Sequence, residues 1–89
     1  MKIRNGFVAR DVGNKTFVVA VGELSKTFNV MITLNETGKA IWQALQVDTS
    51  VDDIVEKLLL DFEGAEKEIV KQDVITFINK LDEANIIEK

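Results

Sequence analysis

One continuous run in the chain, FNVMITLNETGKAIWQAL from residue 28 to residue 45, predicts a strand that passes directly into a helix. Over residues 28–34 apolar side chains alternate with others, the period-two pattern of a strand that buries one face. Asn35 then offers a side-chain oxygen to the unpaired N–H groups of a helix that begins at Glu36. In that helix one face carries Gly38, Ile41, Trp42 and Leu45.

The residues before this run are typical of strands. Residues 6–12 and 15–21 are rich in β-branched and aromatic side chains, and Gly13 and Asn14 separate them. We therefore expect a hairpin with a connection of three to four residues. Three strands joined by short loops favour an antiparallel meander, with the second strand in the centre and residues 28–34 at an edge.

The residues after the run predict two more helices. Ser50 is suited to cap a helix that ends before Gly64, with apolar side chains at i, i+3, i+4 and i+7. The last helix spans about residues 66–84, and Asn85 can close it because asparagine tolerates a left-handed conformation. Its apolar stripe consists of Val70, Val74, Phe77, Leu81 and Ala84, with Ile78 at the shoulder.

The composition indicates one α+β domain over residues 1–89. The chain has no Cys and no His, so it lacks thiolate ligands, disulfides and the commonest general base. No apolar run approaches the ~20 residues that span a bilayer, and the N-terminal residues lack a signal-peptide core. We expect a cytoplasmic protein that does not bind membranes.

Charge is distributed unevenly along the chain. Residues 1–47 carry six basic and three acidic side chains, for a net charge of +3, whereas residues 48–89 carry five and twelve, for −7. An acidic helical half repels a phosphate backbone, so we expect no nucleic-acid binding. The same acidic surface can steer a basic partner toward the protein.

No combination of side chains predicts catalysis. The chain has two serines, of which Ser25 lies in a polar loop and Ser50 is explained as a helix cap. Neither has a histidine to activate it. The carboxylates lie near helix ends or on solvated faces, and the sequence contains no glycine-rich phosphate loop. We expect no enzymatic activity, no metal and no cofactor.

Three stretches, FNVMITLNETGKAIWQAL, DDIVEKLLLDF and QDVITFINKLDEANII, resemble the PqqD-like family over essentially the whole chain. The resemblance implies a winged-helix-like domain with an N-terminal three-stranded antiparallel sheet followed by three helices. It implies a RiPP recognition element, which binds the leader segment of a ribosomally made precursor peptide. Such a domain presents that leader to a modifying enzyme, often a radical-SAM protein. The leader adds as a strand to the third strand, in a groove against the third helix.

The residues support the same site independently. An exposed strand edge is normally protected by charge or proline, and residues 28–34 contain neither. Ile75 lies about 140° from Val70 around the last helix, off its apolar stripe, and can form an apolar flank beside the strand. A single exposed isoleucine is also common without any function. The predicted peptide-binding residues are Phe28, Asn29, Val30, Met31, Ile32, Thr33, Lys71, Ile75, Ile78 and Asp82.

Two alternative functions remain open from the sequence. Three helices with a small sheet also suit a winged-helix DNA-binding regulator, although the last helix offers only Lys67, Lys71 and Lys80 as cations. A structural subunit could instead use the bare strand edge to pair with a second copy of itself. For the peptide-binding reading we expect a monomer or a weak homodimer.

Overall fold

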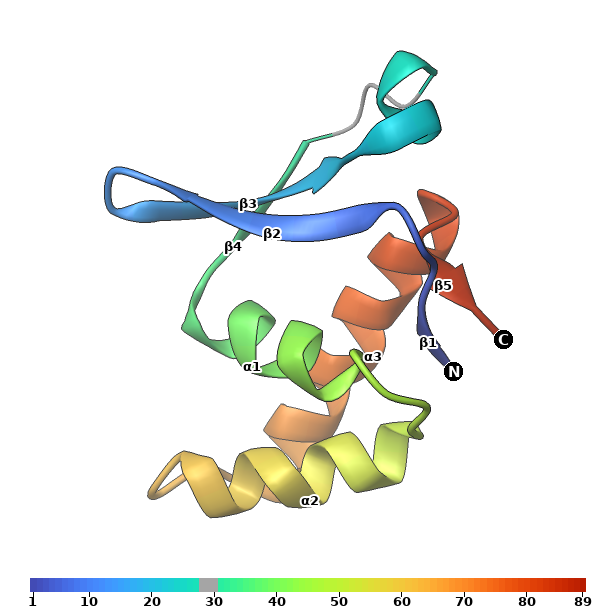
Figure 1. Cartoon of the computed structure of the whole chain (residues 1–89). Coiled ribbons are helices and arrows are strands. Elements are labelled where there is room, and N and C mark those ends of the chain that lie inside the picture. Colours follow the sequence, from blue (N-terminus) through green and yellow to red (C-terminus); the bar gives the residue numbers. More distant parts are fainter. Residues whose placement is uncertain (28–30) are drawn as a thin grey trace.

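The computed structural model describes residues 1–27 and 31–89 and has the predicted α+β architecture (Figure 1). An antiparallel sheet in the order β2-β3-β4 precedes three helices. Its strands are β2 (Phe7–Val12), β3 (Lys15–Ala20) and β4 (Ile32–Leu34). A short 3₁₀ helix, η1 (Gly22–Lys26), occupies part of the predicted polar loop between β3 and β4. The prediction that the second strand is central and the third lies at an edge is confirmed.

The connection between β2 and β3 is shorter than predicted. Val12 pairs directly with Lys15, so the turn contains two residues, Gly13 and Asn14, rather than three to four. Gly13 has a φ of 64°, the positive value that two-residue hairpin turns require at their first central position. The tight turn lets the two strands pair without interruption from Phe7–Ala20 to Val12–Lys15.

The helices begin and end where local sequence signals place them. Helix α1 (Glu36–Ala44) is capped by Asn35, whose side-chain oxygen accepts a 2.8 Å hydrogen bond from the Gly38 N–H. Helix α2 (Val51–Asp61) is capped in the same way by Ser50. Helix α3 (Lys67–Glu83) is followed by Asn85 at a φ of 64°, so the predicted left-handed residue is confirmed.

Two short strands that the sequence analysis did not predict join the ends of the described chain. Strand β1 (Lys2–Ile3) pairs antiparallel with β5 (Ile87–Glu88), in a sheet separate from the first one (Figure 1). The Ile3 N–H also donates a 3.0 Å hydrogen bond to the Leu45 carbonyl, and the Arg4 N–H donates one of 2.8 Å to the Ile86 carbonyl. The first of these bonds joins β1 to the end of α1, and the second joins the residue after β1 to the residue before β5.

The core lies between the sheet and the helices. Ile32 and Leu34 of β4 pack with the α1 residues Ile41 and Trp42, all almost completely buried. Val74 of α3 and Leu58 of α2 belong to the same cluster. The β2–β3 hairpin projects beyond the helices in Figure 1, and its residues from Ala9 to Lys15 are exposed. Within the described residues, no helix is long and apolar enough to cross a membrane.

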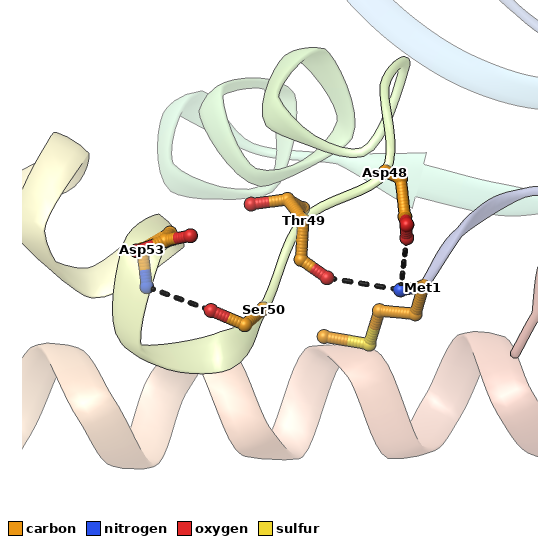
Figure 2. A network of polar contacts seen from close by, with 5 residues as sticks. All are labelled: Met1, Asp48, Thr49, Ser50 and Asp53. Carbon is orange, nitrogen blue, oxygen red and sulfur yellow. Dashed lines mark hydrogen bonds and ion pairs between the residues drawn. The ribbon is translucent and has the colours of Figure 1, made fainter.

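The segment between α1 and α2 holds the amino group of Met1 (Figure 2). This group lies 2.6 Å from a carboxylate oxygen of Asp48 and 2.9 Å from the Thr49 carbonyl oxygen. The adjacent Ser50 side chain accepts a hydrogen bond from the Asp53 N–H. The hydrogen bond and positive charge of the Met1 ammonium lower the pKa of the Asp48 carboxyl below its ordinary value.

We expect this pair to stabilise the fold only while Asp48 is ionised. Because the folded-state pKa is lowered, its contribution is complete above the unfolded-state pKa and is lost as the pH falls through the folded-state pKa, below about 4. Urea unfolding should therefore show Asp48→Asn to be slightly less stable than wild type at about pH 7, with a smaller difference at about pH 2.5. An equal difference at both pH values would contradict the charge-based explanation.

Candidate functional site

Strand β4 forms one of the two edges of the β2-β3-β4 sheet. Strand β4 pairs with β3 on one side, and no element among the described residues pairs with its other side. Part of the predicted strand, Phe28, Asn29 and Val30, lies outside the described residues. Met31, which was predicted to belong to this strand, lies just before β4, so the described part of the edge consists of the three residues Ile32–Leu34.

The sheet register shows which backbone groups of β4 point away from β3. In a hairpin with a two-residue turn the flanking pair, Val12 and Lys15, exchanges both hydrogen bonds, and such pairs alternate along an antiparallel ladder. By this alternation the backbone groups of Thr16 and Val18 in β3 point away from β2 and toward β4. Their partners in β4 are Leu34 and Ile32, so the N–H and C=O groups of these two residues point toward β3. The backbone groups of Thr33 therefore point outward, where another strand can pair with them.

Side chains of β4 alternate between the two faces of the sheet. Ile32 and Leu34 are 3% and 4% exposed and face the helices, whereas Met31 is 66% exposed and Thr33 is also on the solvent side. A strand added at this edge would place every second side chain on the face of Ile32 and Leu34. Those side chains would extend toward α1 and α3.

A pocket of about 320 Å³ opens where β4 ends. The start of α1 forms one wall and a flank of α3 forms the other, with the lining residues Asn35, Thr37, Gly38, Ile41, Asp73, Thr76, Phe77 and Lys80. The absence of a side chain at Gly38 keeps this junction close. A Cβ atom there would lie 3.2 Å from the Asn35 side-chain oxygen and 3.5 Å from side-chain atoms of both Leu34 and Phe77. The prediction that Gly38 permits close approach of helix and sheet agrees with these distances.

The predicted α3 residues occupy a different flank from the one that lines this pocket. Lys71 and Ile75 are partly buried, Ile78 is 8% exposed within the core, and the Asp82 carboxylate lies 3.0 Å from the Lys89 ammonium. Within the described part of the chain, none of these four lines the pocket. Phe77, which does, lies about 160° from Ile75 around the helix. A role for the Ile75 flank in peptide binding stays a prediction.

Sequence analysis did not identify Asp73, Thr76 or Lys80 as site residues, and it assigned Phe77 to the core stripe. Phe77 is in fact only partly buried and has one side turned to the pocket. The other pocket residues on this flank of α3 are polar. The flank therefore has no apolar residue outside the core stripe, which was the feature that identified Ile75. The sequence does contain one sign of this pocket, the segment from Asn35 to Gly38. Its capping residue and its helical glycine bring the first turn of α1 against α3.

Comparison with protein families gives one match that covers most of the chain. The model for Coenzyme PQQ synthesis protein D (PqqD) matches residues 15–87. The chain belongs to the PqqD family. Because PqqD-family proteins are non-catalytic peptide-binding adaptors, the prediction that this chain is not an enzyme is confirmed.

Among solved structures, the PqqD-family fold seen here matches that of TbiB1, which was determined in complex with the TbiA(beta) leader peptide. The TM-score is 0.76 at 19% sequence identity, and the match covers 99% of this chain and 95% of that chain. This likeness confirms the predicted winged-helix-like arrangement of sheet and helices. No curated protein sequence matches the chain.

Proposed function

We propose that this PqqD-family protein binds the leader segment of a ribosomally synthesised precursor peptide by strand addition at β4. The observation that carries the proposal is the outward-pointing backbone of Thr33 beside a pocket at the end of the same strand. Backbone hydrogen bonds would hold the leader in register, and the pocket would take alternate side chains. The leader-bound state of TbiB1, which shares the fold, supports the choice of ligand.

The protein presents the bound leader to a modifying enzyme, of the radical-SAM type or similar, as in PQQ biosynthesis. It performs no chemistry itself, needs no cofactor and acts in the cytoplasm, where newly made precursor peptides are encountered. The modest number of backbone hydrogen bonds, each worth about 1 kcal/mol net, is largely offset by the ~2–5 kcal/mol cost of ordering a disordered leader. Side-chain pockets therefore provide most of the specificity, and the free protein is a monomer or a weak homodimer.

Two adjacent residues of α3 distinguish the pocket flank from the Ile75 flank. Thr76 is exposed and lines the pocket, whereas Ile75 faces away from it. We expect Thr76→Glu to weaken leader binding about tenfold, because a charge placed at the pocket must be desolvated when the leader binds. The matched variant Ile75→Glu tests the flank that the sequence analysis predicted. A leader that lies only at the pocket should bind this variant as it binds the wild type.

The measurement is calorimetric titration with synthetic peptides that cover the N-terminal parts of short precursors encoded beside this gene. Melting temperatures of both variants provide the control for folding. Loss of binding in Ile75→Glu alone would place the leader on the other flank of α3. If no peptide from any neighbouring precursor binds the wild-type protein, leader recognition is the wrong function.

A further inference from the structure

A second pocket continues from the first one along α3. It has a volume of about 230 Å³ and lies between the end of α2 and the start of α3, with Phe62, Ala65 and Ile69 among its lining residues. Ile69 is 58% exposed, so its apolar side chain is open to a binding partner at this pocket. Thr37 and Asp73 line both pockets, so the two hollows adjoin one another across these residues.

Three residues of α3 mark the course of this surface. Phe77 lies in the first pocket, Asp73 at the boundary and Ile69 in the second, each four residues from the next. Four helical residues advance about 6 Å, and two residues of an extended peptide advance about 6.6 Å. An extended peptide lying along this flank therefore brings every second side chain to Phe77, Asp73 and Ile69 in turn.

The negative charge at the boundary between the two pockets indicates which peptide side chain fits there. Asp73 is exposed and forms no ion pair with another described residue. The second pocket is lined by the carboxylates of Asp73 and Glu66 and by no cation from the described chain. Lys67, the nearest basic residue in sequence to Glu66, pairs with Glu56 of α2 at 3.7 Å. A lysine or arginine is therefore the side chain that complements this position.

We propose that the bound leader continues past β4 and is recognised at both pockets through the pattern apolar–any–Lys/Arg–any–apolar. The two apolar residues fill the pockets at Phe77 and Ile69, and the basic residue between them meets Asp73. This inference rests on the proposed leader-binding function and adds to it the sequence class of the leader. A second copy of the protein is a poor occupant, because its helical half carries the same net charge of −7 over residues 48–89.

The test uses a phage-displayed library of random peptides about 16 residues long, enough for a strand at β4 and the five-residue pattern. The library is selected on the immobilised full-length protein and, in parallel, on Asp73→Lys. Peptides enriched on the wild type should contain two apolar residues four apart with Lys or Arg midway. On Asp73→Lys, the midway residue should change to Asp or Glu. Glu83→Lys, which makes the same charge change at an exposed α3 position outside both pockets, should select the wild-type pattern.

A second variant tests the pocket at Ile69 separately from the rest of the binding site. We expect Ile69→Glu, at a position already 58% exposed, to weaken the selected peptides about tenfold without changing the melting temperature. If Thr76→Glu weakens the binding of these peptides and Ile69→Glu does not, the proposed leader binding stands and the role of the pocket at Ile69 is wrong. If Ile69→Glu instead reduces self-association in sedimentation, the second pocket belongs to an interface between copies. Failure to enrich any peptide, while a leader from a neighbouring precursor still binds in calorimetry, would contradict the inference and leave the proposed function standing.

Discussion

Thr33→Pro should weaken leader binding about tenfold or more while the protein stays folded. The register directs the Thr33 N–H away from β3, so proline removes a donor that only an added strand would use. The proline ring also obstructs a strand that approaches this edge. Thr33 is exposed and lies in an edge strand, where proline is tolerated. Binding is measured by calorimetry with a leader that binds the wild type, and folding by circular dichroism.

The neighbouring substitution Ile32→Pro is the matched comparison. The Ile32 N–H points to β3 and its side chain is 3% exposed, so proline there removes a ladder hydrogen bond and a core side chain. We expect it to destabilise the fold by about 3 kcal/mol or more. If Thr33→Pro destabilised the protein as much as Ile32→Pro, the assignment of outward and inward groups in β4 would be incorrect.

Val74→Asp should unfold the protein at room temperature. Val74 is completely buried at the centre of the core, and no described cation is positioned there to pair with a carboxylate. Burying an unpaired charge costs about 4 kcal/mol or more, a large part of the 5–15 kcal/mol that stabilises a typical domain. Fluorescence of Trp42, which is 3% exposed, reports the loss of packing directly.

Ile75→Glu provides the contrast at the next position of α3. Ile75 is only partly buried, so its carboxylate can reach water, and we expect the free energy of unfolding to change by about 1 kcal/mol or less. Thermal melts of the two variants measure the difference. Equal loss of melting temperature in both would show that the faces of α3 are wrongly assigned.

Local signals in the sequence predicted most of the fold because each has a direct structural cause. Alternation over residues 31–34 identifies the buried face of β4, and Asn35 and Ser50 form the caps expected of them. The positive φ of Asn85 also follows from its residue type and its position after a helix. In each case the interacting groups lie within a few residues of one another.

The features that sequence reasoning missed depend on contacts between distant segments. Strands β1 and β5 contain two residues each, too few to show any periodicity, and they form because the chain ends meet. Which flank of α3 borders the pocket also depends on contacts between distant segments. Both flanks are mixed in polarity, and only the packing of α1 against α3 through Gly38 decides which one borders β4.

Amide hydrogen exchange at β4 with and without a bound leader tests strand addition most directly. Exchange at Ile32 and Leu34 should be slow in the free protein and change little, because these amides already point to β3. Exchange at Thr33 should be fast in the free protein and slow by about tenfold or more when the leader binds. Unchanged exchange at Thr33 with a saturating leader would contradict strand addition at this edge.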